Sequence, residues 1–442
     1  MTIKEFAKTD LTFGVPVVAL IVIAMVAVFM VLNRTAPFLL QEAFAVLVAL
    51  APLWAPFFLL RIFWKLWVRY RRANFHDSQK IALLEVRIPR EMRKSPLAME
   101  AALAGLHIGI GETTFVDRNF KGKTRTWFSL ELVSIDGNIH FYIWTRDFFK
   151  ELVKAQIYAQ YPEVEIAEVD DYTKYLPFDL SKYRYWGSDF KLTKPDAYPL
   201  RTYIDYGLDS TAAKEEEKTD PFASVLELLG SIPKGHQIWI QILIQTHKGT
   251  RKWPWSSRFT WREEAEKLIE RMLKKASERT GRVVDVDEES AFGRLPALTE
   301  GERETIKAID RSLGKPGFDC GIRVAYFAEK DKFHAIYLVG LLGVWKQFSS
   351  FNLNSLTYTR WLGEFDFSWQ DFREIRQNRM RRRFYEAFRL RSWFHEPYKT
   401  PTYVLNTEEL ATIYHFPGEV AKTPTIPRVP SRRGEPPANL PI

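Results

Sequence analysis

Two long apolar stretches near the N-terminus constrain this chain more than any other feature. From Val15 to Leu32 the sequence carries no charged residue, and this length suits a helix that crosses a bilayer. A second stretch, Phe38–Phe63, is apolar except at Gln41, Glu42 and Arg61. A signal peptide is the competing interpretation, but the first stretch is longer than a signal core and leads directly into the second. We therefore predict an uncleaved transmembrane helical hairpin over residues 1–72.

The residues that flank these stretches predict how the hairpin sits in the membrane. The turn between the stretches contains one basic residue, Arg34, whereas the outer flanks contain Lys4, Lys8, Lys65, Arg69, Arg71 and Arg72. Because positive residues stay on the cytoplasmic side, we expect both ends and the bulk of the chain in the cytoplasm, at the inner membrane. Tryptophans favour the membrane interface, so the predicted anchor residues facing the lipid bilayer are Trp54, Trp64, Trp67, Arg71 and Arg72.

The composition is that of a folded protein with an anionic partner. A chain of 442 residues with 46% hydrophobic content is long enough for two or three domains with real cores. Its formal net charge of +9 favours phosphate backbones or acidic lipid headgroups. The single cysteine, Cys320, excludes an intrachain disulfide and a cysteine-based zinc cluster, which fits a reducing compartment.

The first soluble segment, residues 73–180, has the pattern of an α+β unit. A strand-like run at Ile81–Pro89 precedes a helix that Ser95 caps and Pro96 begins. Two β-rich runs flank Asp136-Gly137-Asn138, a strong hairpin signal. A helix over Arg146–Pro162 follows, with the predicted buried positions Phe148, Phe149, Leu152, Val153, Gln156 and Ile157. With a closing strand, the order is β-α-β-β-α-β, the split βαβ of ferredoxin-like domains.

Residues 181–365 repeat this order with longer insertions, so we predict a second ferredoxin-like unit. Asp220 and Pro221 begin a helix in favoured positions, and a clear strand follows near 236–247. A charged insertion over Arg258–Lys315 interrupts the central hairpin, and a strand at Gly321–Glu329 resumes it. The sequence leaves open whether the two units pack as one body.

Sequence motifs for catalysis are missing from the chain. No GxxxxGK[ST] phosphate-binding loop occurs, and the eight histidines contain no HxxxH pair. No GxSxG nucleophile elbow is present either. We expect no enzyme activity, no metal and no cofactor. An enzyme whose site is assembled from distant segments is kept as a third hypothesis.

The strongest positive signal is the arginine-rich segment Arg373–Arg391. It carries eight arginines and two glutamates, so its net charge of +6 is two thirds of the excess of the whole chain. One interpretation is a basic amphipathic helix that binds nucleic acid, a membrane or an acidic partner. The other is a solvated helix whose aromatic residues pack on the domain and whose arginines pair with carboxylates. The candidate binding residues are Arg373, Arg376, Arg379, Arg381, Arg382, Arg383, Arg389 and Arg391.

Residues 366–418 contain this basic helix and a second, apolar one. The second helix begins near Asn406 or Thr407, either of which is a good N-cap. Its predicted docking surface, for its own domain or for a neighbour, consists of Leu410, Ile413, Tyr414 and Phe416. A proline-rich tail, residues 419–442, follows as a semi-rigid lead or as a frayed terminus.

Four segments resemble the region that precedes the ATPase in a family of membrane-anchored proteins. They are Ala82–His107, Phe141–Thr173, Asp220–Gln245 and Tyr403–Ile442. The family is that of type IV secretion and conjugation-like proteins with a HerA/FtsK-like motor, particularly those of candidate-phyla bacteria. These segments contain no catalytic residues, so the resemblance implies the non-ATPase region and a P-loop motor ATPase supplied in trans.

These observations together predict a membrane-anchored structural or docking component of a type IV secretion or conjugation-like apparatus that positions this motor. The alternative is a membrane-tethered nucleic-acid-binding protein that uses the arginine-rich segment. A homo-oligomer is compatible with both hypotheses.

Overall fold

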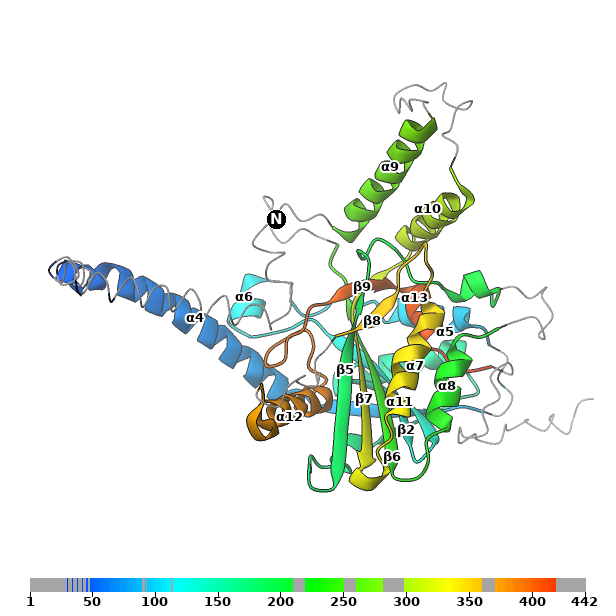
Figure 1. The fold of residues 1–442 in the computed structure, drawn as a ribbon, viewed down its shortest axis with the longest axis horizontal. Coiled ribbons are helices and arrows are strands. Elements are labelled where there is room, and N and C mark those ends of the chain that lie inside the picture. The colour runs from blue at the N-terminus through cyan, green and yellow to red at the C-terminus, as the bar shows by residue number, and fades with distance from the viewer. Residues whose placement is uncertain are drawn as a thin grey trace, which may run out of the picture. The chain divides into compact units, whose positions relative to one another are not determined.

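The computed structural model describes residues 30, 34, 38, 42, 45–46, 48–89, 92, 94–112, 114–209, 219–249, 260–280, 298–359 and 370–418. The chain divides into two compact units, residues 1–71 and 72–442. Figure 1 shows the elements of each. The predicted tail 419–442 lies outside the described residues, and so does the first predicted apolar stretch except at Met30. The helical hairpin therefore remains a prediction.

Helix α4, Ala51–Asp77, is long and apolar enough to cross a membrane, and the described residues contain one such helix. None of its residues is fully buried within the protein, and Leu53 and Phe57 are 76% and 71% exposed. A continuous apolar surface of this kind is unfavourable in water and suits lipid. The helix covers the end of the second predicted stretch and continues beyond it to Asp77.

In the second compact unit, residues 72–442, the described residues of the first half form four strands and three α-helices. They are β1 (Ile81–Arg87), α5 (Pro96–Gly105), α6 (Phe115–Asn119), β2 (Trp127–Ile135), β3 (Asn138–Arg146), α7 (Lys150–Gln160) and β4 (Glu165–Val169). All pairs are antiparallel, in the order β4-β1-β3-β2. Asp136 and Gly137 form the predicted hairpin turn with φ of 55° and 85°, as a type I′ turn requires. Ser95 is the N-cap of α5 and Pro96 is its first residue, as predicted.

The second half repeats this strand order. Its elements are β5 (Tyr183–Leu192), α8 (Phe222–Gly230), β6 (His236–Thr246), α9 (Trp261–Thr280), α10 (Glu300–Leu313), β7 (Gly317–Glu329), α11 (Ile336–Gly343) and β8 (Leu356–Tyr358). These strands are antiparallel in the order β8-β5-β7-β6, which corresponds position by position to β4-β1-β3-β2. Asp220 accepts a hydrogen bond from the Phe222 amide at 2.9 Å, but the N-cap of α8 is Pro221, so the helix begins one residue later than predicted.

One continuous sheet joins the two halves. Strand β2 pairs with β6 in antiparallel register from Trp127↔Gln245 to Ile135↔Gln237. The two edges that each half would expose on its own therefore cover one another, which removes unpaired backbone groups. A ninth strand, β9 (Tyr403–Asn406), pairs with β7 from Gly317 to Cys320. These residues of β7 precede Ile322, at which the pairing of β7 with β5 begins. The two predicted units thus form one body.

Different elements cover the two faces of this sheet. On one face, helices α5, α7, α8, α11 and α13 (Thr407–Ile413) enclose the larger hydrophobic core. Helix α12 (Ile375–Arg389) and the loops around it cover the second, aromatic-rich core on the other face. Alternate residues of one strand point to opposite faces, so Ile240 and Ile242 of β6 lie in the first core and Trp239 and Leu243 in the second.

Helices α9 and α10 form an arm in the connection between the paired strands β6 and β7, where the sequence predicted an insertion (Figure 1). Its base is a small apolar cluster in which Ala197, Ala265 and Ile309 are buried. Arg279 of α9 pairs with Glu302 of α10 at 2.8 Å, and both helices carry many charged side chains. The arm is therefore held by its base and presents a charged surface to solvent.

Short 3₁₀ helices complete the described part of the chain at Asp147–Phe149, Tyr172–Lys174, Tyr203–Tyr206, Lys330–Lys332, Val344–Phe348 and Phe372–Glu374. The first of them explains one wrong prediction. Helix α7 begins only at Lys150, and Phe148 is 83% exposed rather than buried. Phe149, Val153 and Ile157 are buried as predicted.

Candidate functional site

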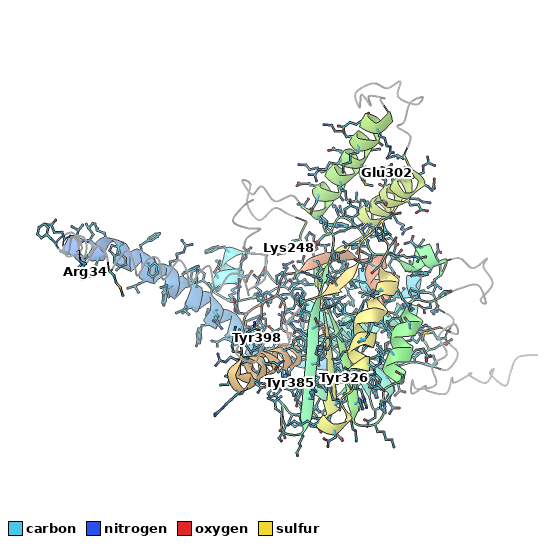
Figure 2. The ribbon with its side chains drawn as sticks, in the orientation of Figure 1. Arg34, Lys248, Glu302, Tyr326, Tyr385 and Tyr398 are labelled. Atoms are coloured by element: carbon cyan, nitrogen blue, oxygen red, sulfur yellow. The ribbon has the colours of Figure 1, made fainter. Side chains whose placement is uncertain are left out.

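Helix α12, which carries most of the predicted binding arginines, packs one side on the sheet. Phe384, Tyr385 and Phe388 are buried in the second core. Tyr385, labelled in Figure 2, donates its hydroxyl to the carbonyls of Leu176 at 2.6 Å and Thr173 at 3.2 Å. The aromatic residues interleaved with the arginines therefore hold the helix in place. This packing is what the second interpretation, a solvated helix on the domain, predicted. The binding interpretation depends on where the arginines point.

The eight arginines have different environments. Six of them are exposed: Arg373, Arg376, Arg379, Arg382, Arg383 and Arg389. Arg381 is partly buried and donates to Glu374 at 3.2 Å and to the Asn378 side chain at 2.9 Å. Arg382 pairs with Glu386, one turn along the helix, at 3.0 Å. The outer side of α12 therefore offers a basic surface.

Arg391 is not part of that surface, and its prediction as a binding residue was wrong. Its side chain is 1% exposed and donates to both carboxylate oxygens of Glu131, at 2.9 and 3.0 Å. It also pairs with Asp171 and lies over the Tyr172 ring, 5.5 Å from the centroid. Glu131 is 0% exposed and accepts further bonds from Ser129, Tyr172 and Gln241. Arg391 thus compensates a carboxylate buried on the central strand β2.

The backbone explains why the sequence pattern extended the helix through Arg391. Helix α12 ends at Arg389, and Arg391 adopts φ 48°, the left-handed conformation. The amides of Arg391 and Ser392 return to the carbonyls of Phe388 and Ala387, both at 3.0 Å, which is a Schellman motif. Glycine usually occupies this position. An arginine here gives no stop signal in the sequence, and the buried ion pair offsets the cost of its conformation.

A second buried ion pair lies under the same helix and was missed at the sequence level. Arg323 of β7 donates to Asp189 of β5 at 2.8 Å, and both side chains are almost fully buried. The guanidinium lies 4.9 Å from the Trp393 ring and 5.4 Å from that of Phe384. The sequence signal for buried ion pairs was the presence of charged residues within apolar strands, such as Arg323 and Glu131. Their partners lie far away in sequence.

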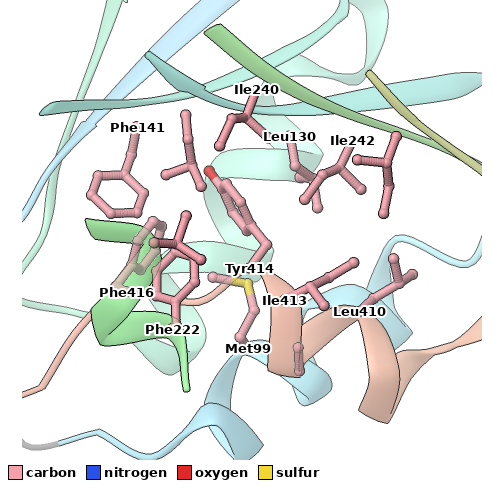
Figure 3. Packing of buried hydrophobic residues seen from close by; sticks show 14 of the residues in the cluster. Met99, Leu130, Phe141, Phe222, Ile240, Ile242, Leu410, Ile413, Tyr414 and Phe416 are labelled. Carbon is pink, nitrogen blue, oxygen red and sulfur yellow. The ribbon is translucent and has the colours of Figure 1, made fainter. Parts of the chain in front are cut away.

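Helix α13 belongs to the core, so the predicted docking surface is wrong as a site for a partner protein. Leu410, Ile413, Tyr414 and Phe416 are each at most 1% exposed, and they pack against α5 and the sheet (Figure 3). The predicted cap is correct: Asn406 accepts from the Glu409 amide at 2.8 Å in a capping box. An apolar helix face near a chain end therefore docks on its own domain here.

Two glutamates of α13 tie together elements that are distant in sequence. Glu408, fully buried, pairs with Arg311 at 3.0 Å and with Lys315 at 2.7 Å, which links α13 to the arm. Glu409 accepts from the amides of Leu200 at 2.7 Å and Asn406 at 2.9 Å. Burial, together with the charge of Glu408, raises the pKa of Glu409 to about 8. This cluster fixes α13 and the arm to each other.

The comparison with protein families decides where this architecture belongs. Residues 75–428 match a family described as a domain of unknown function, DUF8128, and the match covers well over half of the chain. This chain belongs to the DUF8128 family. No curated protein matches it. The DUF8128 region includes every strand of the sheet, the arm, α12 and α13.

Within the described residues of the DUF8128 region, no group of three or more His, Cys, Asp or Glu side chains is placed to hold a metal ion. Cys320 is buried on β7, and its thiol donates to the Phe318 carbonyl at 3.3 Å. Burial raises the pKa of this thiol well above its ordinary value, so it is protonated at neutral pH.

The predicted anchor residues lie on helix α4. Trp54, Trp64, Trp67, Arg71 and Arg72 all fall within Ala51–Asp77. Trp54 and Trp64 are 47% and 36% exposed, and the Arg71 guanidinium lies 5.8 Å from the Trp67 ring. Exposed tryptophans beside arginines match the composition of a membrane interface.

Proposed function

We propose that this DUF8128 protein is a membrane-anchored docking component of a type IV secretion or conjugation-like apparatus, which positions a P-loop motor ATPase supplied in trans. One observation carries most of the weight. Helix α4 ends at Asp77 and β1 begins at Ile81, so a helix suited to a membrane leads into the sheet through three residues. Such a short connection between the end of the helix and the first strand supports a role as a platform anchored to a membrane.

The proposal includes a finer description of the fold and its location. Each half of the sheet is a ferredoxin-like unit, and the two units are fused through β2 and β6. The repeated strand order supports this description. The anchor is a helical hairpin with both ends in the cytoplasm, which the distribution of basic residues around Arg34 supports. Protease accessibility of the body in inside-out and right-side-out vesicles tests the orientation.

The contact with the motor is assigned to the proline-rich segment 419–442 and to the exposed surfaces of the body. Helix α13 and the residues that follow it are buried up to Phe416, which supports this assignment. A segment that follows a fixed element has a defined starting point, so a partner that binds it is tethered to the body.

The test is purification of the full-length protein from its native cell in mild detergent, with mass spectrometry of the proteins that remain bound. A parallel variant lacks residues 419–442. The truncation begins after Gly418 because removing β9 and α13 would destroy the core. Retention of a P-loop ATPase by the intact chain and its loss with the tail support the proposal. If the intact chain and the truncated variant retain the ATPase equally, the contact lies on the body. If neither sample contains an ATPase, the proposal is contradicted.

A second candidate function is nucleic-acid binding by the outer side of α12, favoured by its exposed arginines. Replacing Arg379, Arg383 and Arg389 with glutamine leaves the buried aromatic side of the helix intact. Affinity for duplex DNA should fall, and the slope of log K against log salt should decrease by about one unit per lost phosphate contact. Arg279→Gln on the arm is the control for a single lost charge. An unchanged slope in the triple variant contradicts this function.

A further inference from the structure

The most unusual polar cluster of the body lies where the last turns of α4 meet the ends of β2 and β3. It contains Arg72, His76, Trp127, Arg146 and His395. The Nε atom of Arg72, the Nε2 atoms of both histidines and the Nε1 atom of Trp127 are buried without a hydrogen-bond partner. Buried polar atoms normally have partners, so four unsatisfied nitrogens in one cluster indicate a missing ligand.

The rings of this cluster are close together. The His76 ring lies 5.3 Å from that of Trp127 and 5.6 Å from that of His395, and the Trp127 and His395 rings are 5.7 Å apart. The Arg146 guanidinium lies 5.0 Å from the Trp127 ring and 5.1 Å from the Phe75 ring. Arg72 lies four residues before His76 in α4, which places both side chains on the same side of the helix. The unsatisfied nitrogens therefore belong to neighbouring side chains.

The cluster also has an uncompensated positive charge. Arg146 is 6% exposed and donates to the Thr124 hydroxyl at 2.9 Å. In the described part of the chain, no carboxylate pairs with Arg146 or Arg72. Arg391, Arg323 and Arg125 differ in this respect, because each has a carboxylate partner. A buried charge without a counter-charge is costly, so an anion would stabilise this arrangement.

Burial is the main cause of the pKa shifts in this cluster, and nearby positive groups add to it at His395. Burial lowers the pKa of Arg146 to about 10. Burial and the charges of His76, Arg72, Arg125 and Arg146 lower the pKa of His395 to about 2. His395 is therefore a neutral imidazole at physiological pH and serves as a hydrogen-bonding group, not as a further cation.

We propose that Arg72 and Arg146, with the ring nitrogens of Trp127, His76 and His395, bind the phosphate group of an anionic ligand. Guanidinium groups match phosphate oxygens in geometry, and the ring nitrogens supply further donors. The burial of Arg146 favours a single phosphate group over an extended nucleic-acid backbone. Arg72 follows Trp67 in helix α4, so the phosphate of a lipid headgroup is one source. That source rests on the proposed membrane anchoring, whereas a free phosphate does not.

The experiment uses the full-length protein in mild detergent and measures its melting temperature and the ligands that it retains in native mass spectrometry. The probes are inorganic phosphate and phosphatidylglycerol, each titrated into protein stripped of both. At least one should raise the melting temperature, because a ligand that binds only the folded state stabilises it. An increase with phosphatidylglycerol alone assigns a headgroup site, and an increase with inorganic phosphate assigns a site for the free anion.

The variant is Arg146→Met, and Arg279→Met on the arm is the matched control with the same loss of charge. Loss of one charged hydrogen-bonding partner should weaken binding by about ten- to a hundredfold, whereas the control should bind as the wild type does. Without ligand, Arg146→Met should melt at the same temperature as the wild type or higher, because an uncompensated buried charge has been removed. The direction of this change in melting temperature distinguishes a variant that no longer binds the ligand from one that no longer folds.

Two results overturn the proposal: no stabilisation of the wild type by either probe, or equal stabilisation of the wild type and Arg146→Met. Retention of a motor ATPase is measured separately and does not depend on this cluster. The phosphate site and the docking function can therefore fail independently.

Discussion

The two faces of the central sheet are built from alternate residues of the same strands, yet they are stabilised differently. Beneath helices α5, α7, α8, α11 and α13, strands β2, β6 and β7 present almost only aliphatic and aromatic side chains. Beneath α12 the same strands present Glu131, Gln241 and Arg323 between large aromatic residues. The first face requires only apolar cover of the right volume. The second requires partners of defined charge and position, which makes its cover specific.

The largest expected effect tests the second face. Glu131→Ala leaves Arg391 buried without its main partner, so the free energy of unfolding should fall by about 3–5 kcal/mol. The measurement is urea unfolding in mild detergent, followed by tryptophan fluorescence. The double variant Glu131→Leu/Arg391→Met should recover much of the loss because no charge is left unpaired. If the double variant is less stable than Glu131→Ala alone, Arg391 does not act through this pair.

The matching change on the first face is Ile240→Ala. Ile240 is fully buried among aliphatic side chains (Figure 3). Its truncation should lower the free energy of unfolding by about 3 kcal/mol through lost burial and a cavity. Ile240→Val should cost only about 1 kcal/mol by the same unfolding measurement. A larger loss for Ile240→Ala than for Glu131→Ala would reverse the comparison between the faces.

Glu409 is a polar exception within the cover of the first face, and it predicts a pH dependence. Its pKa is raised from 4.5 to about 8, mainly by burial, so the folded state binds its proton more tightly. Stability from this group is present at low pH and is lost as pH rises toward 8. Between pH 6.5 and 8 the contribution of Glu409 should fall by about 2 kcal/mol. His76, His236 and His395 have lowered pKa values, so their contribution rises over the same interval and partly opposes this loss.

The measurement for Glu409 is the free energy of unfolding at several pH values in that interval. Glu409→Gln removes this titrating group and keeps the histidines, so the wild type should lose about 2 kcal/mol relative to the variant over this interval. Stability curves of the wild type and Glu409→Gln that run parallel from pH 6.5 to 8 would contradict the raised pKa.

The smallest expected effect concerns the outer side of α12. Arg382 is 70% exposed and pairs with Glu386 one turn away. Exposed helix pairs of this kind contribute about 0.3–0.5 kcal/mol, so Arg382→Gln should lower the free energy of unfolding by no more than that. Arg391→Gln, only nine positions along, should cost several times more because its site is buried. Equal losses in the two variants would show that burial does not distinguish these arginines.

Local signals in the sequence predicted local structure well. The Asp136-Gly137 turn, the caps at Ser95 and Asn406, and the insertion between β6 and β7 all follow from residues near one another in the chain. Each of these depends on backbone conformations or hydrogen bonds within a few residues. Sequence patterns report such preferences directly.

Features that depend on distant partners were not predictable from the same patterns. The pairing of β2 with β6 joins two strands about a hundred residues apart. The sequence of each strand has the same pattern whether its edge is paired with another strand or free. Leu410 and Tyr414 have an apolar pattern that fits a partner's surface as well as the protein's own core. Arg391 reads as one more arginine of a basic helix, because Glu131 lies on a remote strand. The cluster around Arg146 brings together three separate segments.

The arm has a mechanical consequence. The chain leaves β6 and re-enters β7 at neighbouring residues, since the His247 amide donates to the Gly317 carbonyl at 3.0 Å. A pulling force on the arm would load these two strands from one end, in the unzipping direction, in which hydrogen bonds break one after another at low force. The ion pairs of Arg311 and Lys315 with Glu408 lie in the path of that load. They transmit tension from the arm to α13 before the sheet begins to open.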